Sequence, residues 1–159
     1  MRGPLGVGKT TISARLAQEV GAVHISIDQI LDDRGLWDSG QLSEFLAANA
    51  FAVEQARGFL DRGTPVVFDG NFYWKAQIED LIAKLDFRHF VFTLTAPLSV
   101  CIERDGGRIP SHGSEAATEV YAKTSLFEWG VGVDATRSPD AVLSELTALI
   151  QAPPHGEPG

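Results

Sequence analysis

A glycine-rich run close to the N-terminus constrains this chain more than any other feature. Residues 3–10 read Gly-Pro-Leu-Gly-Val-Gly-Lys-Thr, which matches the pattern G-x-x-x-x-G-K-[ST]. In that pattern the glycines let the backbone wrap closely around a phosphate group and present its N–H groups at the start of a helix. Ile12, Leu16 and Val20 follow at four-residue spacing, as on the apolar face of such a helix. A chance match to this pattern in a chain of this length has a probability below about one per cent. The alternative, a glycine-rich N-terminal turn that carries Lys-Thr by coincidence, is therefore disfavoured.

Two side chains of this phosphate-binding loop predict which ligands it holds. The Lys9 ammonium is placed to reach the β- and γ-phosphates of a nucleotide and to act in catalysis, and the Thr10 hydroxyl is placed to bind Mg²⁺. We therefore expect ATP and Mg²⁺ as cofactors. The candidate nucleotide-binding residues in and directly after the loop are Gly3, Gly6, Val7, Gly8, Lys9, Thr10 and Thr11.

The lead-in to this loop is unusually short. A phosphate-binding loop normally follows a strand, yet only Met1 and Arg2 precede residue 3. Without that strand, the backbone groups of both neighbouring strands should lack partners. We expect that the chain is truncated. Roughly four to six further apolar residues, encoded upstream, would complete a strand of usual length. The alternative is a fold of the residues as given, with a gap or with the neighbours closing up; a stop codon directly before Met1 would exclude truncation.

Short apolar runs alternate with helical patterns along the rest of the chain. This alternation predicts a three-layer α/β fold in which a parallel sheet has helices on both faces. Apart from the missing first strand, strands are recognisable at residues 22–27, 65–68, 87–95 and 131–136. Helices are predicted at residues 11–20, 41–62, 75–85, 97–104, 115–129 and 140–151, with a short helical turn at 28–32. We expect one domain over residues 1–151 and a disordered, proline- and glycine-rich tail over residues 152–159.

Composition limits the partners and the compartment. The 159 residues include 13 Lys and Arg against 21 Asp and Glu, a formal net charge of −8, which disfavours nucleic acid or an anionic membrane surface as the main partner. A single cysteine excludes an internal disulfide and a cysteine-rich zinc site, and it fits a reducing compartment. No apolar run reaches the roughly 18 residues that a membrane span needs. We therefore expect a cytoplasmic protein with a small-molecule partner.

Two predicted strands end in aspartate, at the edge of a parallel sheet where ligands bind. Asp28 is placed to contact a substrate hydroxyl and to accept its proton as the oxygen attacks the γ-phosphorus; alternatively, it caps the turn that follows. Asp69 is typical of a carboxylate that organises Mg²⁺, or else it is a turn residue. Asn71 either contacts the substrate or caps the next segment.

Two arginines lie where a helix gives way to a glycine-rich loop. Arg104 and Arg108 are four residues apart, and Gly106 and Gly107 between them would let such a lid open and close. Guanidinium groups neutralise the charge that spreads over a phosphoryl group during its transfer. The alternative pairs Arg104 or Arg108 with Glu103 or Asp105 on a solvated face. Arg137, after the last predicted strand, either lies against a nucleotide base or is a surface arginine.

The aromatic and histidine residues have mainly structural interpretations. Trp37, Phe72, Tyr73 and Trp74 either floor a substrate pocket or belong to the core, which is the commoner place for aromatic residues. His24 lies inside a predicted strand, and we expect a packed histidine rather than a ligand. No metal-ligand spacing joins the histidines of the sequence.

In their order along the chain, these motifs resemble the small P-loop kinases of the polynucleotide kinase, chloramphenicol phosphotransferase and gluconate kinase group. The resemblance runs from residue 3 to about residue 150; its specific part is the phosphate-binding loop, and the other motifs agree in order and spacing. It implies a five-stranded parallel sheet between helices, here with four recognisable strands. It also implies that Lys9 and Thr10 bind phosphate and Mg²⁺, that Asp28 is the base, and that Arg104 and Arg108 are lid arginines. The chain departs from the family pattern in its missing first strand and its sparsely basic lid.

The leading hypothesis is an ATP-dependent phosphotransferase that moves the γ-phosphoryl group to a hydroxyl of a small molecule. Two alternatives stay open. One is a 5′-hydroxyl polynucleotide kinase, against which the net charge argues, and the other is a nucleotide-binding protein without phosphotransfer. A GTPase is disfavoured because no Asn-Lys-x-Asp base-reading motif follows the loop.

Overall fold

Short parallel strands form the middle layer of the molecule. The computed structural model describes residues 1–37 and 39–152, so residues 153–159 of the predicted tail lie outside the described part. The strands of the described part are β1 (Val23–Ser26), β2 (Val66–Asp69), β3 (Phe92–Thr95) and β4 (Val131–Asp134). Its helices are α1 (Lys9–Val20), α2 (Ile27–Arg34), α3 (Leu42–Leu60), α4 (Lys75–Leu85), α5 (Leu98–Gly106), α6 (Ser114–Thr124) and α7 (Pro139–Gln151).

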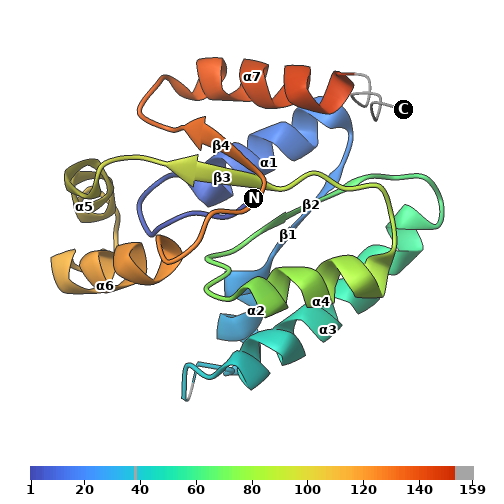
Figure 1. Cartoon of the computed structure of the whole chain (residues 1–159), viewed down its shortest axis with the longest axis horizontal. Coiled ribbons are helices and arrows are strands. Elements are labelled where there is room, and N and C mark those ends of the chain that lie inside the picture. The colour runs from blue at the N-terminus through green and yellow to red at the C-terminus, as the bar shows by residue number, and fades with distance from the viewer. Residues whose placement is uncertain (38, 153–159) are drawn as a thin grey trace.

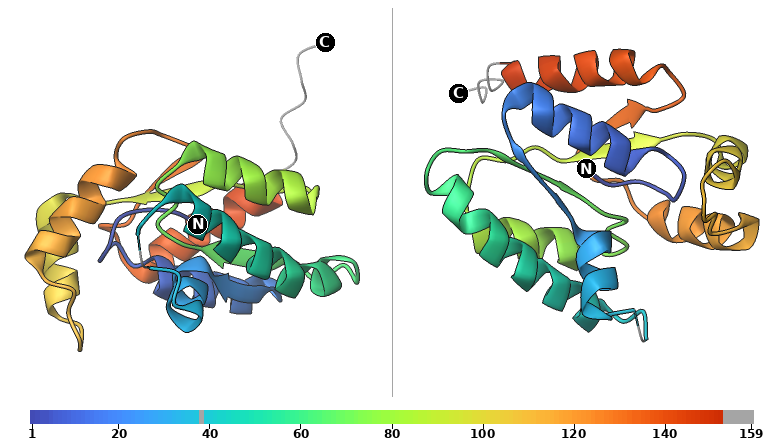
Figure 2. Two further views of the ribbon diagram at one scale, coloured as in Figure 1. Left: turned by 90° about the horizontal axis from the view of Figure 1, so that it is seen from below. Right: turned by 180° about the vertical axis from the view of Figure 1, so that it is seen from behind.

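Helices cover both faces of these strands. Figures 1 and 2 show α1 and α7 on one face and α3 and α4 on the other, while α5 and α6 lie together at one end of the molecule. This arrangement confirms the predicted three-layer α/β fold with parallel strands. No helix among the described residues is long and apolar enough to cross a membrane.

The N-terminal residues join two pairs of strands. β1 pairs in parallel with β2, from Val23 with Val66 to Ser26 with Asp69, and β3 pairs in parallel with β4. Between the pairs, the ammonium of Met1 donates to the Phe68 carbonyl at 2.8 Å, and Arg2 N–H donates to the Phe92 carbonyl at 2.9 Å. The strand order is therefore β1, β2, the segment Met1 to Arg2, β3 and β4. Met1 and Arg2 therefore lie between β2 and β3, where we expected the first strand.

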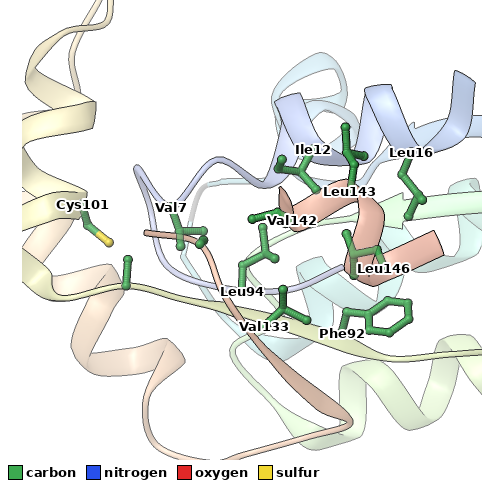
Figure 3. Packing of buried hydrophobic residues seen from close by; sticks show 12 residues of the cluster. Val7, Ile12, Leu16, Phe92, Leu94, Cys101, Val133, Val142, Leu143 and Leu146 are labelled. Atoms are coloured by element: carbon green, nitrogen blue, oxygen red, sulfur yellow. The ribbon is translucent and has the colours of Figure 1, made fainter. Parts of the chain in front are cut away.

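Two apolar clusters fill the space between the layers. The first lies between α1, α7 and the strands β3 and β4, and Figure 3 shows Ile12 and Leu16 of α1 close to Leu143 and Leu146 of α7. The second lies under α2, α3 and α4 and has Phe45, 1% exposed, among its members. The four-residue spacing of Ile12 and Leu16 therefore marks the face of α1 that is buried, as the sequence predicted.

β3 is shorter than predicted, because residues 87–91 lie before its first pairing. The neighbouring strand β4 begins at Val131, which pairs with Phe92, so the earlier residues have no ladder to join. Phe87 and Phe90 are 39% and 41% exposed. The predicted strand rested on apolar residues alone, and apolar content does not tell a strand from an exposed connection.

Helix α6 ends at Thr124 rather than at the predicted residue 129, and a buried arginine holds this end. Arg2 is 1% exposed, and its guanidinium donates to the Thr124 carbonyl at 2.7 Å and to the Phe127 carbonyl at 3.3 Å. It also lies 4.3 Å from the centre of the Phe127 ring. A cation that donates to carbonyls at a helix C-terminus satisfies groups that have no partner within the helix. The residue directly before the phosphate-binding loop therefore ties α6 to the middle layer.

We expect Gly130→Ala to destabilise the fold by about 2 kcal/mol, since it forces both strain and a clash. Gly130 has φ +70°, and a Cβ there would lie 2.0 Å from the Val91 carbonyl oxygen, where β3 and β4 come together. Gly132→Ala is the matched control, because its Cβ would meet no atom within 4 Å, and it should change stability by less than about 0.5 kcal/mol. Urea unfolding of both variants measures the difference; equal stabilities would contradict this account of the β3–β4 junction.

Candidate active site

The phosphate-binding loop packs directly on the backbone of two other elements. A Cβ at Gly6, where φ is +79°, would lie 2.1 Å from the Cys101 carbonyl oxygen of α5. A Cβ at Gly3 would lie 2.6 Å from the Leu94 carbonyl oxygen of β3. Val7 is 1% exposed and belongs to the first apolar cluster. The loop is therefore held in place from behind, and its opposite side faces a cavity.

Lys9, the first residue of α1, closes this loop on itself. Its ammonium donates to the Pro4 carbonyl at 2.9 Å, and the side chain is buried. Burial lowers the pKa of Lys9, and the nearby carboxylates Asp28 and Asp69 oppose that shift. A desolvated ammonium in this position is available to an anion with little competition from water.

Asp69 at the end of β2 is fully buried and only partly satisfied. Its Oδ2 lies 2.8 Å from His24 Nε2, while its Oδ1 has no hydrogen-bond partner among the described residues. Burial alone would raise the pKa of Asp69, but the neighbouring His24 and Ser26 side chains hold it below the usual value. An ionised carboxylate with one free oxygen suits Mg²⁺, which usually takes one or two protein oxygens and keeps several waters. Within the described part of the chain, no group of three or more His, Cys, Asp or Glu is placed to hold a metal ion.

Asp28 lies in the first turn of α2 and faces the cavity. The N-cap of this helix is Ser26, whose hydroxyl accepts from Gln29 N–H at 3.3 Å, so the alternative of Asp28 as the cap is wrong. Asp28 Oδ1 instead accepts from Asn71 N–H at 3.3 Å, which fixes the carboxyl against the segment after β2. Burial raises the pKa of Asp28, Lys9 opposes this shift, and the negative charges of Asp69 and Asp32 add to it.

Asn71 is also buried, at 7% exposed, and is held by its neighbour. Its Nδ2 donates to the Tyr73 hydroxyl at 3.0 Å, whereas its Oδ1 has no hydrogen-bond partner among the described residues. Burial raises the pKa of Tyr73, which therefore stays protonated at neutral pH. The segment after β2 thus brings an amide and a phenol to the same place as Asp28.

One cavity of about 1070 Å³ brings most of these residues together. The phosphate-binding loop, β1, α2, the segments after α2 and β2, α3, α5 and α6 all contribute to its wall. The predicted site residues that line it are Gly6, Gly8, Lys9, Thr10, Thr11, Asp28, Asn71, Arg104 and Arg108. Gly3 and Val7 support the loop from behind, and Asp69 lies below the cavity wall, against His24.

The two arginines of the predicted lid are held differently. Arg104 lies in the last turn of α5, and its Nη1 donates to the Ala135 carbonyl at 2.8 Å and to the Val7 carbonyl at 3.4 Å. Arg108 follows the helix, lines the cavity and lowers the pKa of Lys9 by its charge. Arg104 is therefore anchored to the backbone of the phosphate-binding loop, and Arg108 is the arginine that the loop after α5 carries.

A buried carboxylate shapes the loop that carries Arg108. Asp105 is 1% exposed and accepts from the Ser111 hydroxyl at 2.9 Å, from His112 N–H at 2.9 Å and from Gly113 N–H at 3.1 Å. Burial would raise the pKa of Asp105, but these donors and the His112 ring hold it below the usual value. The loop 107–113 is therefore held by hydrogen bonds to the buried Asp105 carboxylate, which is not the partner of an arginine on the surface.

Arg137 lies beside a second, smaller cavity of about 210 Å³, which is also lined by Thr11 and Arg104. Its Nε donates to the Asp134 carbonyl at 3.2 Å, and its Nη2 is paired with Glu145 of α7. Arg137 thus borders the outer side of the phosphate-binding loop. A role in binding a nucleotide base stays a prediction.

Sequence reasoning missed the part that His24 takes in the site. His24 and Ser26 are two residues apart on β1, so they share one face of the sheet, and Ser26 is paired with Asp69 in the register. That register is the signal that connects His24 with the buried aspartate. Of the aromatic residues with two interpretations, Trp37 and Tyr73 line the cavity, while Phe72 is buried in the second apolar cluster and Trp74 packs against it.

Comparison with known families and proteins gives a consistent result. A family model described as AAA domain (AAA_33) matches residues 1–125. No protein with a curated description matches the chain.

Solved structures of small kinases have the same fold. A sugar kinase from Janibacter sp. HTCC2649 superposes with a TM-score of 0.74 at 19% identity, covering 96% of this chain and 93% of that one. A gluconokinase from Sinorhizobium meliloti 1021 has a TM-score of 0.65 at 18% identity, covering 94% and 92%. The APS kinase of Mycobacterium tuberculosis, solved with AMPPNP and APS, has a TM-score of 0.75 at 14% identity, covering 95% of each chain.

Proposed function

The chain belongs to the AAA domain family AAA_33 and has the fold of small P-loop kinases, and from this premise we propose that it transfers the γ-phosphoryl group of ATP to a hydroxyl group of a small molecule. One observation carries the proposal. The phosphate-binding loop, which carries Lys9, lines the same cavity as the Asp28 carboxyl. The backbone N–H of Asn71 holds that carboxyl in place. A phosphate-binding surface and a base in one cavity are what hydroxyl phosphorylation needs.

In the proposed reaction, the cationic side chains bind and orient the phosphates. The N–H groups of the loop and the Lys9 ammonium hold the β- and γ-phosphates, while Arg108 neutralises charge on the transferred group. Arg104 keeps the loop in position through the Val7 carbonyl. Thr10 and the free oxygen of Asp69 fit a magnesium ion, which would neutralise phosphate charge when bound.

Asp28 is the proposed base. The acceptor oxygen forms a bond to the γ-phosphorus, the bond from that phosphorus to the bridging oxygen of ADP breaks, and the hydroxyl proton passes to the Asp28 carboxylate. A carboxyl with a raised pKa binds this proton more readily than an ordinary one. Asn71 supports the step because its N–H orients the carboxyl, and Asn71 lines the same cavity as Asp28.

A small molecule is the best-supported acceptor. The net charge of −8 disfavours a polynucleotide, and two of the similar structures are named a sugar kinase and a gluconokinase. With ATP as the donor, we place the reaction in the cytoplasm. A nucleotide-binding protein without phosphotransfer is a second alternative, and acceptor-dependent turnover is the property that separates it from a kinase.

The test is ADP formation by the purified protein with ATP and Mg²⁺ against a panel of hydroxyl compounds, with the phosphorylated product identified by ³¹P NMR. We expect at least one small acceptor to raise ADP formation well above the rate with water. A 5′-hydroxyl oligonucleotide in the panel tests the polynucleotide alternative. Tight ATP binding without acceptor-dependent turnover would favour a nucleotide-binding protein without phosphotransfer.

A further inference from the structure

His112 lies in the wall of the large cavity, on the loop that carries Arg108. The two residues are four positions apart, but the backbone of each is tied to Asp105. Arg108 N–H donates to the Asp105 carbonyl at 3.0 Å, and His112 N–H donates to Asp105 Oδ2 at 2.9 Å. The loop is therefore closed on one residue, and the side chains of Arg108 and His112 enter the cavity wall from neighbouring positions.

One nitrogen of the His112 ring is held by a buried carboxylate. Nδ1 lies 3.0 Å from Asp105 Oδ1, and Asp105 is 1% exposed. Burial opposes ionisation of Asp105, but hydrogen bonds from His112, Ser111 and Gly113 hold its pKa below the usual value, so it is a carboxylate that only accepts. Nδ1 therefore carries a hydrogen, and Nε2 is the nitrogen that is left for another partner.

The second nitrogen of this ring is open to a ligand. The N–H directions of Nδ1 and Nε2 diverge strongly across an imidazole, so Nε2 faces away from the buried Asp105. The contact with Asp105 is the one hydrogen bond of the ring among the described residues, and the side chain is 56% exposed. His112 is thus an oriented group with a free nitrogen in the wall of the cavity.

The neighbours of His112 favour a phosphate oxygen as the partner of Nε2. Besides burial, the positive charge of Arg108 lowers the pKa of Lys9, so Arg108 lies within electrostatic reach of the phosphate-binding loop. His112 stands beside Arg108 in the same wall. A protonated imidazole has a donor on each nitrogen and can donate to the Asp105 carboxylate and to a phosphoryl oxygen at once. Hydrogen bonds between charged groups are the strong ones.

We propose that His112 is a further phosphate-binding residue, whose Nε2 donates to an oxygen of the γ-phosphoryl group beside Arg108 while Asp105 fixes the ring. The inference rests on the proposed function for the presence and the place of the nucleotide, but it does not depend on transfer to an acceptor. It also gives the buried Asp105 carboxylate a task in the site, which is to orient His112.

The test uses two substitutions that each keep one half of the hydrogen bonding of the ring. Asparagine can place an amide near Nδ1 and keep the contact with Asp105, but it does not extend to Nε2. Glutamine can place an amide near Nε2 and gives up the contact with Asp105. In both variants the loop keeps the other donors to that carboxylate, which are the Ser111 hydroxyl and the backbone N–H groups of residue 112 and Gly113.

Binding of ADP and of a non-hydrolysable ATP analogue is measured by calorimetry with Mg²⁺ and without an acceptor, so the γ-phosphoryl group is the difference between the two ligands. We expect His112→Asn to lower the affinity for the analogue about tenfold and to leave the affinity for ADP unchanged, which also shows that the variant is folded. His112→Gln should recover most of that loss. His89→Asn is the matched control, because His89 is exposed and its ring contacts the Phe87 carbonyl outside the cavity wall; both affinities should equal those of the wild type.

The order of the two variants decides between a ligand contact and support of the loop. An analogue affinity that survives in His112→Asn and is lost in His112→Gln would make His112 a support of the loop and overturn the inference. Equal losses for ADP and the analogue would also overturn it, because the contact would then lie away from the γ-phosphoryl group.

Acceptor-dependent ADP formation tests the kinase separately. A loss that is selective for the analogue, in a chain that phosphorylates no acceptor, would support the His112 contact and contradict the kinase. Acceptor-dependent turnover together with an unchanged analogue affinity in His112→Asn would support the kinase and overturn the inference.

Discussion

Replacing Lys9 with alanine is expected to lower kcat for phosphoryl transfer about 10²–10³-fold, with weaker ATP binding and an intact fold. The ammonium lies inside the phosphate-binding loop, 2.9 Å from the Pro4 carbonyl, and is the one Lys side chain of the cavity wall among the described residues. Charge develops on the transferred group in a site where water competes little, so a preorganised cation stabilises the transition state strongly. Alanine removes that cation and leaves the backbone donors of the loop in place.

Stability should change little in this variant, because a buried charge is lost together with its hydrogen bond. Burial lowers the pKa of Lys9, which means that the folded chain holds this ammonium at a cost. Lys84→Ala is the matched control: Lys84 is paired with Asp80 on the exposed side of α4, and its loss should leave kcat unchanged. Steady-state kinetics, binding of a fluorescent ATP analogue and thermal melting measure the three effects. A Lys9→Ala enzyme with wild-type kcat would exclude the proposed role of the loop.

The sequence predicted the fold well because its strongest signals are local. The phosphate-binding loop identifies the start of α1, and the four-residue spacing of Ile12 and Leu16 identifies its buried face. The alternation of strands and helices then leaves few arrangements, because parallel strands require helical connections. Residues 87–91 mark the limit of this reasoning, since the beginning of β3 is set by where β4 begins rather than by the residues themselves.

The candidate site was predictable where a residue follows directly from a motif or from a strand end. Lys9, Thr10 and Asp28 are of this kind, and they line one cavity. The contacts that depend on register and on long-range packing could not be predicted. Arg104 donates to the Ala135 carbonyl 31 residues away, and His24 reaches Asp69 only because β1 pairs with β2 in parallel. A single sequence without the strand order contains neither contact.

The part of the cavity wall that α2 and the segments after α2 and β2 contribute shows the same limit in another form. Asp32 and Trp37 belong to a region without a recognisable motif, and Asn71 had two equal interpretations. Only the coordinates reveal their contacts: the Trp37 indole N–H donates to Asp32 Oδ1, and Asn71 Nδ2 donates to the Tyr73 hydroxyl.

Replacing Asp28 with asparagine is expected to lower kcat about 10²–10⁴-fold while raising stability at neutral pH, a combination that a structural residue would not produce. The variant keeps an oxygen that accepts from Asn71 N–H, so the local geometry survives, but it has no basic carboxylate. Asp33→Asn is the matched control, because Asp33 is an exposed carboxylate of α2 outside the cavity wall, and both kcat and melting temperature should stay close to the wild-type values.

The direction of the stability change follows from the pKa of Asp28, which burial raises above the unfolded value near 3.9. Below the unfolded pKa the group is protonated in both states and costs nothing. As the pH rises through the folded pKa, the carboxylate ionises in a site that disfavours its charge, and folding stability is lost. Asparagine removes this loss, so the gain in melting temperature should be present at pH 7 and should shrink toward pH 4. Wild-type activity should rise over the same pH range in which Asp28 ionises, because only the carboxylate accepts the proton, and the variant should lack this rise. A variant that keeps the pH-dependent rise would show that another group is the base.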